Sequence, residues 1–296
     1  MSNSKFQIPN SKFQIPMLEQ ITPVILTYNE APNIGRTLEM LSWARDIVVV
    51  DSFSDDQTTT IIKQTPQARV VQRKFDCLAN QWNFALSQCG ITTEWVLALD
   101  ADYLLTAPLV EELKHLRPTP DVRGYRANFV YCINGRRLRG SAYPPVTVLY
   151  RLDGALYRQD GHAHRVIVDG TVIELQSEIL HDDRKSLSHW IRSQDKYMQL
   201  ERKKLLESPV HALGWADRIR RLRVVAPFAI FVYCLFIKGA ILDGLPGIYY
   251  AFQRLLSELL LSLYLFEESL PDENQPESMN SVVTRNKQIS YKVNPE

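Results

Sequence analysis

The chain has 296 residues, and 45% of them are apolar, which is far too apolar a composition for a disordered protein. Its 34 Lys and Arg residues nearly balance its 33 Asp and Glu residues, so no global basic field is available to hold nucleic acid. The four cysteines have neither CxxC spacing nor the density of a disulfide-stapled fold, which indicates reduced thiols. We therefore expect one substantial domain with an appended segment and no nucleic-acid partner.

Both ends of the chain have the composition of tails. The heptad NSKFQIP occurs at residues 3–9 and again at 10–16, without a clear amphipathic period, and we interpret residues 1–20 as a disordered low-complexity tail. Residues 267–296 are rich in Pro, Asn, Ser and charged side chains and predict a second disordered tail.

Strand and helix patterns alternate between residues 21 and 117. The strands are ITPVILTYN, DIVVVDS, ARVVQRKF and EWVLALDAD, and helices are expected over residues 33–44, 55–64 and 78–87. Strands this uniformly apolar are buried on both faces, and helical crossovers between them predict a mostly parallel, doubly wound sheet. Residues 124–181 are rich in strand patterns, and a charged helix is expected over 186–206. The predicted fold class is therefore an α/β domain over residues 21–206.

Residues 207–266 predict a helical, membrane-associated segment. Residues 224–242 carry a single charge, Lys238, and as one helix would be about 28 Å long, close to the thickness of a bilayer core. A second apolar helix follows a Gly- and Pro-containing break, and it carries Arg254 and Glu258 as an i,i+4 pair that favours the membrane surface.

The basic stretch DRIRRLR precedes these helices and offers arginines to anionic lipid head groups. We therefore expect a helical hairpin that lies in, or dips into, the cytoplasmic leaflet. The alternative is a buried helical pair that caps the sheet or joins two copies of the chain, and a true membrane span ranks third.

Polar side chains follow three of the predicted strands at the edge where a doubly wound sheet binds ligands. The first strand is followed by Thr27, Tyr28, Asn29 and Glu30, the second ends at Asp51, and the fourth leads into Asp100 and Asp102. No GxGxxG or GxxxxGKS sequence follows any strand, so neither a dinucleotide-binding loop nor a P-loop is expected. The two carboxylates of Asp100 and Asp102 are hard oxygen ligands and predict a site for Mn²⁺ or Mg²⁺.

Four motifs in order, TYNEAPNI, VVVDSFSDDQT, FDCLANQWNFAL and WVLALDAD, resemble the nucleotide-diphospho-sugar domain of glycosyltransferase family 2, which has the GT-A fold. The branch they resemble contains the lipopolysaccharide-core β-1,4-glucosyltransferases, and the similarity extends over residues 21–266. This resemblance implies that the donor nucleotide and diphosphate are contacted by Thr27, Tyr28, Asn29, Glu30, Asp51, Gln81, Asn83 and Asp100. It also implies that Asp100 and Asp102 hold the divalent metal.

The stretch HDDRKS resembles a segment of the same branch and supplies candidates for the base. Transfer with inversion needs one group to take the proton of the acceptor hydroxyl, and Asp182 or Asp183 is expected to do this. The alternative for either aspartate is that it only caps the helix that begins near Ser186.

The resemblance implies an inverting, metal-dependent transfer of a hexose, with glucose expected, from a nucleotide-diphosphate sugar, with a UDP-sugar expected. The implied acceptor is a lipid-linked saccharide, such as a lipopolysaccharide core or another cell-envelope glycan, at the cytoplasmic face of the inner membrane, where the enzyme would be peripheral or monotopic. The alternative is a catalytically weakened nucleotide-sugar-binding or membrane-scaffold protein, because Tyr103 and Arg165 stand where the family usually has acids. A nucleotidylyltransferase would need a Gly-rich loop after the first strand, which TYNEAPN lacks.

Overall fold

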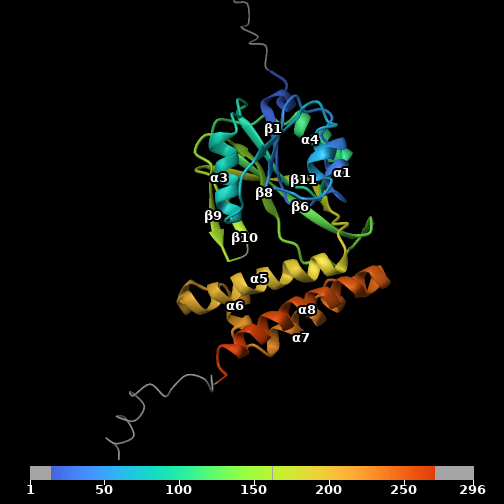
Figure 1. Ribbon diagram of the computed structural model, residues 1–296, viewed down its shortest axis with the longest axis vertical. Helices are drawn as coiled ribbons and strands as arrows, with labels where there is room; N and C mark the ends of the chain where they lie inside the picture. The colour runs from blue at the N-terminus through green and yellow to red at the C-terminus, as the bar shows by residue number, and fades with distance from the viewer. Residues whose placement is uncertain (1–14, 162, 271–296) are drawn as a thin grey trace, which may run out of the picture.

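A computed structural model describes residues 15–161 and 163–270 of the chain. An α/β domain lies above a group of long helices formed by the C-terminal part of the chain (Figure 1). Most of the two predicted tails lies outside the described residues. The domain begins earlier than expected, because Met17–Gln20 forms a 3-10 turn and the Met17 side chain is buried in the core.

The central sheet has the strand order β3-β2-β1-β4-β8-β6-β11-β5, with β7 paired to β6. The first four strands in this order are parallel: β3 (Ala68–Gln72), β2 (Ile47–Asp51), β1 (Ile21–Thr27) and β4 (Trp95–Asp100). The strand β8 is antiparallel to both of its neighbours, while β6 and β11 are parallel to each other. Six of the eight strands along this order therefore point the same way, which confirms the expected mixed and mostly parallel sheet.

The remaining strands are β5, which directly follows β4, and the strands of the β-rich half of the domain. They are β5 (Tyr103–Leu105), β6 (Val122–Ile133), β7 (Arg136–Arg137), β8 (Val146–Arg151), β9 (Leu156–Asp160), β10 (Ala163–Ile167) and β11 (Thr171–His181). The strand β5 closes one edge of the sheet by pairing with β11, and β9 and β10 form a separate hairpin. The predicted change to a β-rich pattern after residue 124 is confirmed.

Successive residues of the inner strands point to opposite faces of the sheet, and both faces are covered. Ile25 and Val49 contribute to the cluster under α1 (Ile34–Glu39), α2 (Thr58–Ile62) and α4 (Ala107–His115), and Val24 and Val48 to the cluster under α3 (Leu78–Gln88). The helices α3 and α1 lie on opposite sides of the sheet in Figure 1. This two-sided burial is the physical reason why these strands are uniformly apolar.

The helices α1 and α2 are shorter than the sequence predicts. The helix expected over 55–64 begins only at Thr58, because Asp56 accepts the backbone N–H of Thr58 at 2.9 Å and holds residues 52–57 as a loop. The helix expected over 78–87 is confirmed as α3, and the charged helix expected over 186–206 is α5 (Leu187–Glu207).

The C-terminal segment contains α6 (Trp215–Arg220), α7 (Val225–Val232) and α8 (Leu245–Glu267), and α8 packs along α5 and α7 (Figure 1). The prediction of one apolar helix over 224–242 is wrong. The helix α7 continues as a π-helical turn over Tyr233–Ile237, and the chain then reverses at Gly239, where φ is 76°. A left-handed residue of this kind ends a helix. Within the part of the chain that the structure describes, no helix combines the length and the apolar character needed to cross a membrane.

The expected pair between Arg254 and Glu258 is also wrong. Glu258 is 4% exposed and binds Arg220, whose Nη2 lies 2.6 Å from its Oε1. Arg220 lies 3.3 Å from the carboxylate of Asp217 and 3.6 Å from that of Glu201, so this arginine is held between α5, α6 and α8 rather than offered to lipid. The i,i+4 spacing of residues along one helix cannot predict an ion-pair partner that comes from another helix.

The helical segment is docked on the domain through the loop after β7. The carboxylate of Asp243 accepts the backbone N–H groups of Arg139 at 2.8 Å and Gly140 at 3.1 Å. A Cβ atom at Gly140 would lie 2.4 Å from the backbone nitrogen of Ala240, so the close approach requires glycine here. The Tyr250 hydroxyl accepts the N–H of Ala142 at 3.0 Å, which ties α8 to the same loop.

Candidate active site

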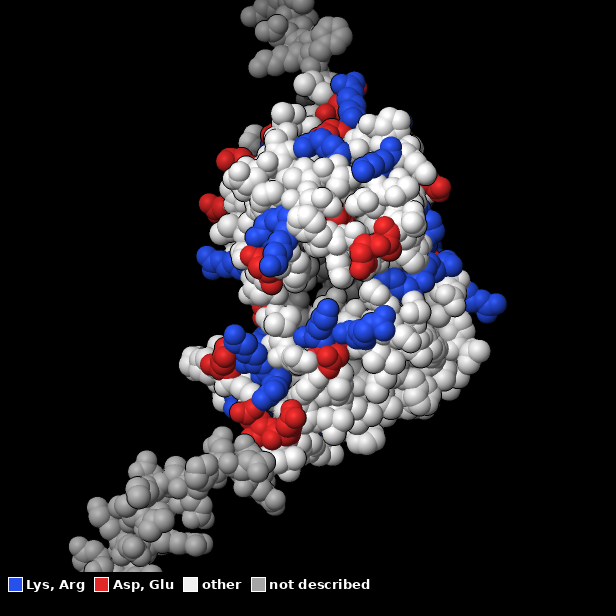
Figure 2. All heavy atoms as spheres, viewed as in Figure 1, with Lys and Arg blue, Asp and Glu red and all other residues white. Residues whose placement is uncertain are grey.

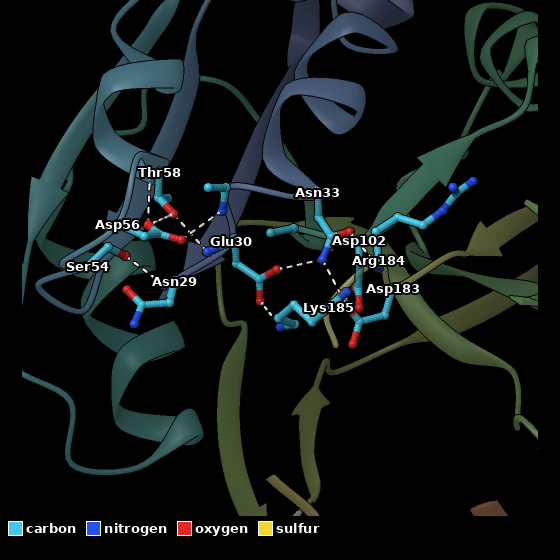
Figure 3. Close-up of polar contacts among 12 residues, drawn as sticks. Asn29, Glu30, Asn33, Ser54, Asp56, Thr58, Asp102, Asp183, Arg184 and Lys185 are labelled. Carbon is cyan, nitrogen blue, oxygen red and sulfur yellow. Dashed lines mark hydrogen bonds and ion pairs between the residues drawn. The ribbon is translucent and has the colours of Figure 1, made fainter. Parts of the chain in front are cut away.

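The carboxyl ends of β1, β4 and β11 meet at one edge of the sheet, and the sequence-predicted acids gather there (Figure 3). Leu26 pairs with Asp100 across β1 and β4, and His181 pairs with Tyr103 across β11 and β5. The turn between β4 and β5 therefore brings Asp102 beside the end of β11.

The TYNE and HDDRKS segments are joined directly at this edge. Lys185 Nζ lies 2.6 Å from Glu30 Oε1, although the two residues are 155 positions apart. The Asn33 amide donates to Glu30 Oε2 and to Asp183 Oδ1, both at 2.9 Å (Figure 3). Burial and the charge of Asp102 together raise the pKa of Glu30 to about 7, even though Lys185 acts in the opposite direction.

Asp100 and Asp102 form the candidate metal site. Burial, and then repulsion from Asp102, raises the pKa of Asp100, while the charges of His164 and His181 partly offset both effects. Burial also disfavours ionised Asp102, but the charge and the 3.1 Å contact of His181 lower its pKa overall. Conversely, Asp102 raises the pKa of His181 against the effect of burial.

The donor set fits a hard divalent cation. Two neighbouring carboxylates that repel each other gain from a cation between them, and Mg²⁺ or Mn²⁺ bound to a diphosphate needs only one or two protein carboxylates. Among the described residues, no cluster of three His, Cys, Asp or Glu side chains forms a complete protein cage for a metal. The remaining ligands would then be phosphate oxygens and water.

The carboxylate of Asp51 makes its hydrogen bonds within the protein in this structure. Its side chain is fully buried, and its two oxygens accept hydrogen bonds from Thr27 Oγ1 at 3.1 Å, Gln72 Nε2 at 3.3 Å, Ser54 N at 3.0 Å and Ser54 Oγ at 2.5 Å. Thr27 is buried with it. In this structure both residues hold the loop after β2 in place, and neither presents a free polar atom to a ligand.

Two aromatic rings are exposed at the same end of the sheet. Tyr28 is 50% exposed and Phe53 is 56% exposed. Phe53 has a φ of 61°, which turns the loop after β2, and Asn29 has a φ of 54° and donates its N–H to Ser54 Oγ at 2.9 Å. The sequence analysis did not single out Phe53, and the signal for it was an aromatic residue two positions after the strand-end aspartate.

The two predicted polar residues of α3 have different surroundings. Gln81 donates to Ser52 Oγ at 3.0 Å and accepts from Arg73 at 2.5 Å, so it lies beside the loop after β2. Asn83 instead uses both ends of its amide on the backbone of Tyr157, at 3.0 and 2.8 Å. Asn83 therefore joins α3 to β9 and departs from the predicted nucleotide pocket.

The structure separates the two candidate bases. Asp182 is 2% exposed, and its carboxylate accepts from Arg36, from Arg184 and from the N–H of Gly135. These contacts outweigh the effect of burial and lower the pKa of Asp182, so this carboxylate is a poor proton acceptor. Its ion pairs instead have a structural role. The sequence analysis did not anticipate Arg36, which reaches Asp182 across 146 positions of the chain.

Among the described residues, the donors to the Asp183 carboxylate are neutral: the Asn33 amide at 2.9 Å and the Lys185 N–H at 3.0 Å, both on Oδ1. It also lines an open cleft, so its carboxylate can be reached by a ligand. The helix-capping alternative is wrong for both aspartates, because Ser186 caps α5 by accepting the N–H of His189 at 3.3 Å.

Tyr103 stands at the position that raised the alternative of a weakened enzyme. Its ring is buried among Phe129 and His181, and its hydroxyl lies 2.6 Å from that of Tyr143. Tyr103 also lowers the pKa of Asp100 slightly, against the effect of burial. This residue therefore supports the acidic pair from the core.

Sequence comparison finds similarity to known glycosyltransferases. The chain is 28% identical over 242 residues to the lipopolysaccharide core biosynthesis glycosyltransferase LpsC of Rhizobium meliloti, which covers 77% of this chain and 84% of the relative. It is 34% identical over 100 residues to an uncharacterized glycosyltransferase of Rickettsia felis, and that match covers 33% of this chain and only 34% of the relative.

Among solved structures, the mannosyltransferase PcManGT of Pyrobaculum calidifontis, in complex with GDP-Man and Mn²⁺, is 16% identical with a TM-score of 0.49, covering 86% of this chain and 90% of that one. TarS of S. aureus, in complex with UDP-GlcNAc, is 14% identical with a TM-score of 0.42, covering 86% and 98%.

Residues 22–160, which include β1 to β4 and the Asp100–Asp102 pair, match the family model of glycosyl transferase family 2. Residues 22–160 are therefore a glycosyl transferase family 2 domain.

Proposed function

We propose that the protein transfers a sugar from a nucleotide-diphosphate sugar to a saccharide acceptor, with inversion, by single displacement. One observation carries this proposal: an acidic pair that fits a divalent cation and an accessible carboxylate, Asp183, meet at the edge where β1, β4 and β11 end. A metal-assisted leaving group and a separate base are the two parts that such a displacement needs.

The chain's own residues divide the chemistry between them. Asp100 and Asp102 would hold Mn²⁺ or Mg²⁺, which when bound neutralises charge on the departing diphosphate. Asp183 accepts the proton of the attacking hydroxyl, and Asn33 orients its carboxylate. Lys185 remains paired with Glu30 at 2.6 Å and so balances part of the acidic charge around the reaction centre.

The exposed rings of Tyr28 and Phe53 support a nucleotide site at the ends of β1 and β2. An exposed aromatic face binds a base by stacking without fixing which base it is. A UDP-sugar donor and glucose as the transferred hexose belong to the same proposal, on the strength of the family resemblance.

A lipid-linked acceptor, such as a lipopolysaccharide core or another cell-envelope glycan, is the finer part of the proposal. The similarity to LpsC supports it, because that match covers 77% of this chain and 84% of the relative. The acceptor class of this chain is tested separately below.

We also propose that the protein lies on the cytoplasmic face of the inner membrane as a peripheral or monotopic enzyme. The part of the surface formed by α7 and α8 is almost free of charged residues in Figure 2. The turns between α7 and α8, together with the first residue of α8, carry large exposed apolar side chains, including Phe236 at 57%, Ile237 at 73%, Leu242 at 73% and Leu245 at 78%. Apolar patches of this kind mark membrane or protein interfaces, so an association of two copies through these helices is the competing arrangement.

The first experiment is a thermal-shift panel of nucleoside diphosphates with and without Mn²⁺, using the full chain. A ligand that binds only the folded state raises the unfolding temperature by mass action. We expect one diphosphate to give a shift that depends on Mn²⁺ and is lost in Asp102→Asn. Slow Mn²⁺-dependent hydrolysis of the corresponding nucleotide sugar would then separate an enzyme from a protein that only binds. The absence of any shift across the panel would contradict the proposed donor site.

A further inference from the structure

A cleft of about 590 Å³ separates the reaction edge from the C-terminal helices. Asp183 and Lys185 line it from the domain, and Leu245, Tyr249 and Gln253 line it from α8. The candidate base therefore faces the helical segment across an open space. A ligand that reaches Asp183 through this cleft must contact α8.

The cleft continues into an apolar groove of about 300 Å³ between α5 and α8. Tyr249 and Gln253 line both spaces, and the groove then follows Phe252, Leu256 and Leu259 along α8. From Tyr249 to Leu259 the helix rises by about 15 Å. The groove thus has a polar end at the reaction centre and an apolar end along the helices.

Gln253 marks the junction between the two spaces. The residue is 8% exposed, and its Oε1 is buried without a hydrogen-bond partner among the described residues. Leaving a buried carbonyl oxygen without a hydrogen bond is unfavourable, so a ligand that donates a hydrogen bond there would be favoured. A sugar hydroxyl is such a donor.

We propose that this cleft is the acceptor site and that it takes an amphiphile, with the sugar head group at Asp183 and Gln253 and a single apolar chain in the α5–α8 groove. The inference rests on the proposed function, because Asp183 is its base. Continuity with the reaction edge favours this occupant over a second copy of the chain: a protein partner in the groove would leave the polar end of the cleft unfilled. The side chains of Phe252 and Leu256, which are 55% and 45% exposed, form an apolar wall that the alkyl chain of the ligand would cover.

The test measures, by calorimetry, the binding of octyl, decyl and dodecyl β-maltosides to the full-length protein at concentrations below those at which they form micelles. Maltose, which has no alkyl chain, is the control ligand. A fully buried methylene contributes about fourfold in affinity, so a groove that is open on one side predicts at least a threefold gain for every two carbons. Leu256→Glu is expected to reduce dodecyl maltoside binding at least tenfold. Leu222→Glu is the matched control, because Leu222 is 61% exposed and lines neither the cleft nor the groove.

A second variant, Gln253→Met, removes the unsatisfied oxygen with little change in side-chain volume. It is expected to weaken dodecyl maltoside at least threefold and to leave the gain per two carbons unchanged. Equal affinity for all three chain lengths would overturn the proposal, and so would an equal loss in Leu222→Glu, because binding would then reflect the general apolar surface. Absence of probe binding together with a dimer that Leu256→Glu dissociates would assign the groove to a second copy.

Each sample is also tested for the Mn²⁺-dependent shift with the nucleoside diphosphate that stabilises the wild type. We expect Leu256→Glu and Gln253→Met to retain this shift. A wild-type protein that binds the maltosides as expected but shows no diphosphate shift would refute the proposed function and leave the amphiphile site standing. The reverse result would refute the site alone.

Discussion

The adjacent aspartates after β11 are predicted to have different roles, and a pair of isosteric substitutions separates them. Asp182→Asn removes the charge that Arg36 and Arg184 contact at 2.8 Å or less. Removing one partner of a buried ion pair costs about 3–5 kcal/mol. The two arginine side chains are 30% and 36% exposed, so water recovers part of this, and we expect a loss of about 2–3 kcal/mol.

Asp183→Asn is expected to leave the free energy of unfolding within about 1 kcal/mol of the wild type, because its donors, the Asn33 amide and the Lys185 N–H, are neutral and an amide oxygen accepts from both. Removal of the base should instead lower the rate of turnover by about 10²–10⁴. The assay is Mn²⁺-dependent hydrolysis of the nucleotide sugar, in which water takes the place of the acceptor, together with thermal unfolding of both variants.

The pH dependence gives an independent check on Asp182. Its pKa is lowered in the folded protein from the ordinary 3.8, so its contribution to stability is present above that pH and is lost as the pH falls through the folded pKa. The difference in unfolding temperature between the wild type and Asp182→Asn should be roughly 4–12 °C near neutral pH and should shrink below pH 3.8. The assignment of Asp183 as the base would be refuted by two results together. These are an Asp182→Asn variant that is as stable as the wild type but does not hydrolyse the nucleotide sugar, and an Asp183→Asn variant that still hydrolyses it.

Three further outcomes are expected. Asp102→Asn should abolish the Mn²⁺-dependent thermal shift while changing metal-free stability by less than about 2 kcal/mol, since it removes one hydrogen bond to His181, and an undiminished shift would contradict the metal site. Glu258→Gln should destabilise the protein by about 3 kcal/mol by leaving Arg220 partly unpaired, measured by urea unfolding, and a cost under about 1 kcal/mol would show that the cluster holds nothing together. Replacing Ile237 and Leu242 together by Lys should reduce sedimentation with neutral liposomes at least tenfold at unchanged unfolding temperature, and equal sedimentation would place the membrane contact elsewhere.

Much of the fold could be predicted from local patterns. Strands such as IVVVD are apolar at every position because both faces of the sheet are covered, and this burial shows directly in the sequence. The gathering of Glu30, Asp100 and Asp102 at one edge also follows from the sequence, because the carboxyl ends of parallel strands meet on the same side.

Other features needed the folded chain. The apolar run 224–242 has the composition of one helix, yet Gly239 turns left-handed so that Ala240 can approach Gly140 of the domain. Composition reports how apolar a segment is, but the point where it must bend is set by what it packs against. For the same reason Glu258 found Arg220 on another helix in place of Arg254 on its own.

The sequence by itself determined the family resemblance, the order of strands and helices from β1 to β4 and the acidic pair at the end of β4. Only the tertiary structure decided that Asp182 is paired with Arg36 and that Asp183 is open to the cleft. It also decided that the side-chain polar atoms of Asn83 and Asp51 are already hydrogen-bonded within the protein. Local sequence specifies what a side chain is able to do. Its freedom to do so depends on donors that arrive from more than a hundred residues away, and long-range packing alone sets those contacts.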